Sequence, residues 1–378
     1  MSQQYSNYLE QIDSLAALLS DETQRLSDKH RLSLKVPDVY GIRQIIITGS
    51  GDSYIAGLAA APAIRAWTGL PVQVMVSMEA SRYVDAGVPP LAGRNRGLLV
   101  VAVSNSGEAA RLVEATQRLR NLGALTLALT GNPQSRLGKA AEVVSEVIVP
   151  PSANAPGTRS YLASLISLYL LGLRLAEILM CVTMDDANAM RREIAELSGP
   201  LGSVAKSLRQ PIATLADAWA TSSVCDCLGS GPSLGSASFA AAKLVEAAGL
   251  HASSQDAEEF HHLNYFVADI SAPALVFAPG NALSAARSKE LCATLAGLGR
   301  PFAVVTDDAT MAGQQHVLNV PRVREWFAPI VHAVPASLLA AEFAERRGVV
   351  HYRGHTGPWS GAVGANLVRN SPIDTSRS

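Results

Sequence analysis

Short apolar runs alternate along the chain with longer segments in which apolar residues recur at helical spacing. In the first half, buried β-strands are predicted at residues 44–49, 71–77, 97–103, 125–130 and 146–149. Helical patterns lie between these runs, for example in residues 54–67 and 110–122. Such alternation is typical of a parallel sheet covered by helices on both faces. The chain is therefore predicted to be an α/β protein.

The same order of strand, turn and helix returns in the second half. Strands are predicted at residues 223–228, 274–277 and 301–306, and helices at 236–248, 283–298 and 330–346. The pattern Gly-Ser-Gly-x-Ser occurs at residues 49–53 and again, in register, at 229–233. We interpret the chain as two copies of one α/β unit, each a three-layer αβα, flavodoxin-like fold.

This pattern divides the chain into four parts. Residues 1–34 are predicted to form an amphipathic helix or a pair of helices, and residues 35–195 and 196–345 the two α/β domains. Residues 346–378 are expected to form an extended tail, because Gly354 begins a stretch rich in glycine and polar residues. The longest apolar stretch, residues 161–181, is interrupted by serine, arginine and glutamate, which predicts a buried helix rather than a membrane span.

Composition and charge exclude several classes of partner. Hydrophobic residues make up 48% of the 378, enough for a large core, and the net charge is only −1. We therefore expect no nucleic acid or anionic membrane as principal partner. The four cysteines have neither C-x-x-C nor zinc spacing, which predicts free thiols in a reducing, cytoplasmic compartment. The polar residues 1–11 do not resemble a secretory signal.

A hydroxyl-rich turn lies between the strand predicted at 97–103 and the helix after it. Ser104, Asn105 and Ser106 form this turn. Unpaired N–H groups at a helix start attract an anion, and serine hydroxyls add donors, so a phosphate fits here without a P-loop. The alternative is a serine N-cap on an ordinary crossover. Other hydroxyls expected at the same sheet edge, where ligands of open α/β sheets bind, are those of Ser50, Ser53 and Thr158.

The second half carries ionisable groups instead of such turns. Lys243 and Glu246 lie on the helix predicted at 236–248, and His261 and His262 follow in an acidic segment. Glu246 stands among alanines and leucines, where burial is expected to raise the pKa of a carboxyl and suit it to proton transfer. The alternative is a solvated residue at a helix end. Adjacent histidines on a helix point in different directions, so no metal site is predicted.

Taken in order, these motifs resemble those of proteins with two sugar isomerase (SIS) domains, over about residues 35–345. The first-half motifs are Gly-x-Ser-Tyr at 51–54, Arg-Tyr at 82–83, which matches the end of a longer family motif, Ser-x-Ser-Gly-Glu at 104–108 and Thr-Arg-Ser-Tyr at 158–161. In the second half, Lys-x-x-Glu at 243–246 and Glu-Phe-His-His at 259–262 resemble the isomerase domain of glucosamine-6-phosphate synthase, with the same separation from Glu246 to His262.

The resemblance implies a role for each matching residue. Glu246 would be the general base that moves a proton between C1 and C2 of an open-chain sugar, with Lys243 beside it. His262, donated by the other subunit of a homodimer, would assist ring opening. No metal or organic cofactor is implied, because the substrate forms its own enediol or enaminol. The residues implied to bind the sugar phosphate are Gly51, Ser53, Ser104, Asn105, Ser106 and Thr158.

Three departures from the family pattern bear on the activity. Ala109 stands where the family usually has threonine or serine, so a looser phosphate cradle is expected. The start Met1–Ser2–Gln3 leaves no room for an N-terminal glutaminase domain, and no lysine follows Lys289 to supply the family's C-terminal amine.

The leading hypothesis is a cytoplasmic isomerase/deaminase that acts on amino-sugar or ketose 6-phosphates, of the glucosamine-6-phosphate and fructose-6-phosphate type. The alternatives are a deglycase that cleaves fructosamine 6-phosphates and a sugar-phosphate sensor without catalysis. The sugar, the reaction direction and the leaving amine stay open at this point.

Overall fold

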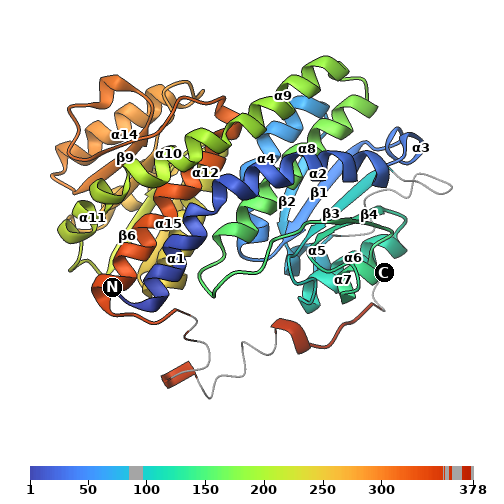
Figure 1. Cartoon of the computed structure of the whole chain (residues 1–378), viewed down its shortest axis with the longest axis horizontal. Coiled ribbons are helices and arrows are strands. Elements are labelled where there is room, and N and C mark those ends of the chain that lie inside the picture. Colours follow the sequence, from blue (N-terminus) through green and yellow to red (C-terminus); the bar gives the residue numbers. More distant parts are fainter. Residues whose placement is uncertain (85–96, 352, 354–356, 360–367, 376–378) are drawn as a thin grey trace. The chain divides into compact units, whose positions relative to one another are not determined.

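The computed structural model describes residues 1–84, 97–351, 353, 357–359 and 368–375 (Figure 1). The chain forms two compact units, each built from non-contiguous segments. The first unit consists of Leu18–Pro150, Ser160–Ala195 and Arg353–Ser378, and the second of Met1–Ala17, Pro151–Arg159 and Glu196–Tyr352. The four-part domain division remains a prediction. Part of the predicted extended tail lies outside the described residues.

The first unit contains a parallel five-stranded sheet in the order β2-β1-β3-β4-β5. Its strands are β1 (Gln44–Gly49), β2 (Val72–Val76), β3 (Leu98–Val103), β4 (Leu125–Thr130) and β5 (Val143–Glu146). The central strands β3 and β4 are buried at every position, as parallel strands covered on both faces require. Two predictions are wrong. Strand β2 is half-exposed because it is an edge strand, and β5 ends at Glu146, where the predicted strand began.

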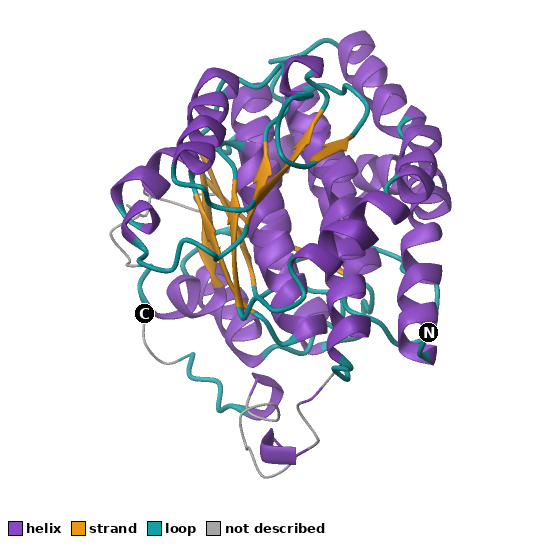
Figure 2. Ribbon diagram, turned by 90° about the vertical axis from the view of Figure 1, so that its left-hand side faces the viewer, coloured by secondary structure: helices purple, strands orange, loops and turns teal. Residues whose placement is uncertain are grey.

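Helices cover both faces of this sheet (Figure 2). Val144 of β5 packs with Leu137 of α7. Oγ of the next residue, Ser145, lies 3.2 Å from Nδ1 of His30 on α2. The period of two along a strand thus sends alternate side chains into opposite layers. The helices of this unit are α2 (Leu15–Ser33), α3 (Val36–Val39), α4 (Asp52–Thr68), α5 (Ser77–Arg82), α6 (Ala110–Asn121), α7 (Arg136–Ala140), α8 (Thr158–Ile178) and α9 (Met184–Glu196).

The second unit repeats the topology, in the order β7-β6-β8-β9-β10. Its strands are β6 (Val224–Leu228), β7 (His251–Gln255), β8 (Ala274–Phe277), β9 (Phe302–Thr306) and β10 (Val317–Asn319). The edge strands β7 and β10 were not predicted, because one is polar and the other very short. The helices are α1 (Gln3–Asp13), α10 (Ser198–Ser207), α11 (Arg209–Ala218), α12 (Pro232–Ala248), α13 (Ala257–His262), α14 (Ala285–Gly297) and α15 (Ala328–Arg347).

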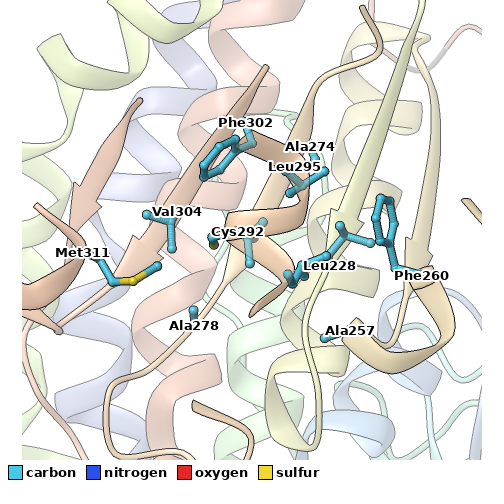
Figure 3. Close-up of a cluster of buried hydrophobic side chains, with 12 residues drawn as sticks. Leu228, Ala257, Phe260, Ala274, Ala278, Cys292, Leu295, Phe302, Val304 and Met311 are labelled. Atoms are coloured by element: carbon cyan, nitrogen blue, oxygen red, sulfur yellow. The ribbon is translucent and has the colours of Figure 1, made fainter. Parts of the chain in front are cut away.

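Apolar side chains fill both sides of the second sheet. On one side, Val304 of β9 belongs to a cluster with Phe260 of α13 and Leu295 of α14 (Figure 3). On the other side, the ring of Phe277 packs against His332 of α15, with ring centroids 5.1 Å apart. The unit is therefore a sheet between two helical layers, as predicted.

The two Gly-Ser-Gly-x-Ser turns have the same backbone geometry. Gly51 has φ 54° and ψ −130°, Gly231 has φ 59° and ψ −130°, and each is the N-cap of the following helix. Positive φ is a conformation that favours glycine. This geometry and the shared strand order confirm that the chain contains two copies of one α/β unit.

In the part of the chain that the structure describes, two helical segments are long and apolar enough to cross a membrane by length and composition. They are α8 and Glu325–Arg347. The most apolar stretch of 18 residues in each is 89% and 100% buried inside the fold, respectively. Such burial is typical of core helices, as predicted for residues 161–181.

Candidate active site

The serine turn follows β3 and leaves its hydroxyls able to donate. The Gly107 N–H donates to Ser104 Oγ at 3.1 Å, and the Glu108 N–H donates to Ser106 Oγ at 3.4 Å. The next helix, α6, has Ala109 as its N-cap, so neither serine caps it and the N-cap alternative is wrong. A hydroxyl that accepts a hydrogen bond still carries a proton to donate. The turn therefore offers two hydroxyl donors.

Close packing against α7 fixes the shape of this turn. Gly107 has φ +67°, and a Cβ there would lie 2.0 Å from Ser135 Oγ, so only glycine fits. Its carbonyl accepts the Leu137 N–H at 3.0 Å. Arg136 Nε donates to Glu108 Oε2 at 2.8 Å, and the Arg136 N–H donates to Glu108 Oε1 at 3.2 Å. These two hydrogen bonds lower the pKa of Glu108. Glu108 therefore serves to hold the turn.

A pocket of about 620 Å³ lies at the carboxyl ends of β1 and β2. Ser50 follows β1, Ser77 follows β2, and their Oγ atoms are 2.6 Å apart. Ala109, from the loop after β3, also lines the pocket. The strand order reverses between β1 and β3, which is where open α/β sheets bind ligands. The predicted ligands Gly51 and Ser53 lie in the adjacent turn and in the first turn of α4.

Two arginines line this pocket, and no predicted motif included Arg111. Arg82 Nε lies 2.7 Å from Glu114 Oε1, and Arg111 Nη1 lies 2.6 Å from Glu114 Oε2. Glu114 is fully buried and also accepts the Asp374 N–H at 2.8 Å. One buried carboxylate thus positions two guanidinium groups. Arg82 belongs to a family-like Arg-Tyr pair, whereas nothing in the sequence marked Arg111.

In the second unit, α12 carries a buried lysine paired with a partly exposed carboxylate. Lys243 is 0% exposed, and its Nζ donates to Oε2 of Glu246, one helical turn further on. The side chain of Glu246 is 35% exposed. The expectation that Glu246 is buried among alanines and leucines is wrong, because Lys243 takes the buried face of the helix. The ammonium group of Lys243 thus holds this carboxylate in one position.

Thr158 lies with residues of the second unit. Its hydroxyl is fully buried, 2.9 Å from Ser337 Oγ and 3.4 Å from the Tyr8 hydroxyl. Burial raises the pKa of Tyr8 to about 12, and the charge of Lys243 opposes this rise. Thr158 therefore has hydroxyl partners from α15 and α1, and its predicted role as a phosphate ligand remains a prediction.

The two adjacent histidines have different surroundings. His261 is half-buried, with Nδ1 2.9 Å from the Ala257 carbonyl oxygen and Nε2 3.1 Å from Thr294 Oγ1. His262 ends α13 with its side chain 64% exposed, and its Nε2 lies 3.2 Å from Glu258 Oε1. His261 is thus held by its neighbours, whereas the ring of His262 is open to solvent, and its predicted role remains a prediction. Within the described part of the chain, no three acidic, histidine or cysteine side chains group to hold a metal ion.

Comparisons with known proteins agree with this architecture. Residues 39–174 match the SIS domain family model. The glutamine–fructose-6-phosphate aminotransferase (isomerizing) of Mycolicibacterium smegmatis is 29% identical over 334 residues, which are 87% of this chain and 52% of that protein. The protein of the same name from Mycobacterium tuberculosis is 30% identical over 335 residues, 86% of this chain and 51% of that protein. The chain thus spans about half the length of these curated relatives.

Two solved structures share the fold. The C-terminal domain of glucosamine-fructose-6-phosphate aminotransferase from Francisella tularensis superposes with a TM-score of 0.78, at 18% identity, covering 89% of this chain and 97% of that one. Glucosamine-6-phosphate deaminase from Thermotoga maritima gives a TM-score of 0.65 at 17% identity. The superposition covers 89% of this chain and 95% of that one. The chain therefore contains a SIS domain at residues 39–174 and resembles an aminotransferase isomerase domain, and it shares its fold with a stand-alone phosphosugar enzyme.

Proposed function

We propose that this protein is an isomerase/deaminase of amino-sugar or ketose 6-phosphates that transfers a proton between C1 and C2. The observation that carries the proposal is the Lys243–Glu246 pair on α12. It combines a carboxylate, open to solvent over 35% of its side chain, with a fully buried cation that fixes its position. These are the features of a general base rather than of a surface salt bridge.

The proposed chemistry uses the residues already described. Glu246 removes the proton from C2 of an open-chain aldose and returns it to C1, through an enediol or, for an amino sugar, an enaminol. The enaminol becomes an imine at C2, and water then hydrolyses this imine to the ketose and ammonia. His262 shuttles the proton between the ring oxygen and the anomeric hydroxyl as the ring opens. Ser104 and Ser106 donate hydrogen bonds to the 6-phosphate, and the turn amides favour its negative charge.

We further propose a homodimer in which His262 serves the site of the partner subunit. The residues directly after His262 expose a group of large apolar side chains: Leu263 59%, Tyr265 39%, Phe266 73% and Val267 42%. A contiguous exposed apolar segment of this kind is typical of a protein interface. A second copy that covers it would take His262 out of solvent. The four thiols are free, which supports a reducing, cytoplasmic location.

One observation favours the deglycase as second candidate. The 620 Å³ pocket of the first unit lies within the size range of ligand sites and carries Arg82 and Arg111. A guanidinium group binds a carboxylate through two parallel hydrogen bonds. A sugar phosphate that carries an amino acid has such a carboxylate, whereas glucosamine 6-phosphate does not.

Product analysis tests the proposal and separates the candidates. Purified protein is incubated with glucosamine 6-phosphate, with fructose 6-phosphate plus ammonium, and with fructosyl-amino-acid 6-phosphates. Ammonia and fructose 6-phosphate establish the isomerase/deaminase, and free amino acid with glucose 6-phosphate establishes the deglycase. Calorimetric binding of these compounds without any product would contradict both and indicate a sensor.

A further inference from the structure

A second pocket, of about 250 Å³ and with a polar lining, lies between α2 and α9 in the first unit. It shares no lining residue with the 620 Å³ pocket or with the serine turn. The described residues that line it include three arginines, Arg31, Arg191 and Arg192, and one carboxylate, Asp28. Most of the others have hydroxyl or amide side chains. The pocket therefore combines positive charge with neutral hydrogen-bonding groups.

Arg191 is a buried arginine of this pocket whose guanidinium group is held in place by neighbouring side chains. It is only 8% exposed, and its Nη1 donates to Glu177 Oε1 at 2.6 Å and to Asn188 Oδ1 at 2.9 Å. Its buried Nε–H has no hydrogen-bond partner in the described part of the chain. A buried donor without a partner costs about 1–3 kcal/mol, and an anion bound in the pocket that accepts from this N–H would remove that cost.

Glu177, on α8, is already shared by three guanidinium groups. Arg191 approaches it at 2.6 Å, Arg174 at 3.5 Å and Arg31 at 3.7 Å. Burial alone would raise the pKa of Glu177, but these arginines hold it below its ordinary value. The carboxylate is thus ionised and cannot neutralise all its neighbours. Together with Arg192 and Asp28, which line the pocket, these groups are four arginines and two carboxylates, so positive charge is in surplus among them.

We propose that this pocket binds a phosphate monoester, a small phosphorylated metabolite, at a site separate from the one that takes the substrate. A phosphoryl dianion matches the surplus charge, and the guanidinium of Arg191, held by Glu177 and Asn188, is already oriented to donate. The volume is below the usual range for larger organic ligands, so it suits a phosphoryl group and a small organic part. The site does not depend on the isomerase chemistry.

Calorimetric titration with inorganic phosphate at constant ionic strength tests the site. The background is a Ser104→Ala/Ser106→Ala variant, which removes the proposed substrate phosphate donors. Phosphate should still bind, and adding Arg192→Glu should weaken that binding about tenfold or more, because a cation becomes an anion at the pocket. Arg192 is exposed, so its substitution spares the Glu177 cluster. Lys139→Glu, which reverses an exposed charge outside both pockets, should change the affinity little.

Each remaining outcome is decisive. No phosphate binding in the double-serine background, or equal affinity with and without Arg192→Glu, overturns the proposed site. If phosphate binding is lost with Arg192→Glu but is unaffected by the two serine substitutions, the site stands and the proposed serine cradle fails. Arg31→Gln provides a second, milder variant that should weaken binding in the same direction.

Discussion

Nζ of Lys243 donates to Oε2 of Glu246 across one turn of α12, with the lysine fully buried and the carboxylate partly open. The buried end of the pair is the cation, which is costly to bury unless it is paired. The cation therefore ties Glu246 to one position at the surface of the second unit. The proposed proton transfer depends on this arrangement.

Removing the turn hydroxyls should affect substrate binding. Ser104→Ala and Ser106→Ala should each raise KM for a phosphorylated substrate about tenfold, the value of one hydrogen bond to a charged group, with a smaller effect on kcat. Steady-state kinetics measure this. Ser203→Ala, which removes an exposed hydroxyl on α10, is the matched control. Wild-type KM in both turn variants would exclude the serine cradle.

Gly107→Ala should distort the same turn through the backbone. A Cβ at φ +67° and 2.0 Å from Ser135 Oγ is strained in two ways, so we expect the free energy of unfolding to fall by about 1–3 kcal/mol. The KM should rise because the hydroxyls move. Urea unfolding and kinetics report the two effects. Gly297→Ala is the control, since nothing lies within 4 Å of a Cβ at that position on α14.

Mixing two inactive variants tests whether subunits share a site. Glu246→Gln and His262→Asn should each be nearly inactive alone. If His262 acts in the partner's site, exchanged mixtures should recover about a quarter of wild-type activity, because half the dimers are mixed and each has one intact site. Each variant mixed with itself is the control. Mixed dimers without recovered activity would show that both residues act within one subunit, or that His262 is not involved.

Buried histidines should make stability depend on pH. Burial lowers the pKa of His30 to about 4, and its ring nitrogens lie 3.0 Å from the Ser167 carbonyl oxygen and 3.2 Å from Ser145 Oγ. In the unfolded chain, the imidazole of His30 takes up a proton near pH 6.5. The stability that comes from burying the neutral ring is therefore complete above pH 6.5 and is lost as the pH falls towards 4. Between pH 7 and 5 the loss is about 2 kcal/mol.

Urea unfolding at pH 7 and pH 5 measures this loss. His30→Gln should reduce the difference between the two pH values by about 2 kcal/mol, since glutamine does not take up the proton. His251→Gln, at an exposed position on β7, should leave the difference unchanged. An equal pH dependence in wild type and His30→Gln would contradict the buried neutral state of His30.

The parts of the fold that the sequence predicted are those in which one pattern dominates. The central strands β3 and β4 are continuous apolar runs, and the two Gly-Ser-Gly-x-Ser turns mark the repeat directly. Strand β7 was missed because an edge strand has less apolar surface to bury, so His251–Gln255 reads as a polar loop. Burial along α12 was assigned to the wrong residue, because helical spacing does not tell which of Lys243 and Glu246 faces the core.

The site was predicted only where local motifs mark it. The serine turn is a local feature of strand, turn and helix, and it was found from residues 104–106. The pairing of Arg82 and Arg111 through Glu114 depends on α5 packing beside α6, which spacing along the sequence does not show. The same holds for the contact of Thr158 with Ser337, residues far apart in the chain.

The most direct test of the central claim is exchange of hydrogen between substrate and solvent. In D₂O, wild-type protein should incorporate deuterium at C1 or C2 of fructose 6-phosphate or glucosamine 6-phosphate, observed by proton NMR. Glu246→Gln should slow this exchange by about 10²–10⁴-fold, the usual contribution of a general base, while phosphosugar binding measured by calorimetry stays near wild type. Exchange at the wild-type rate in Glu246→Gln would show that Glu246 is not the base.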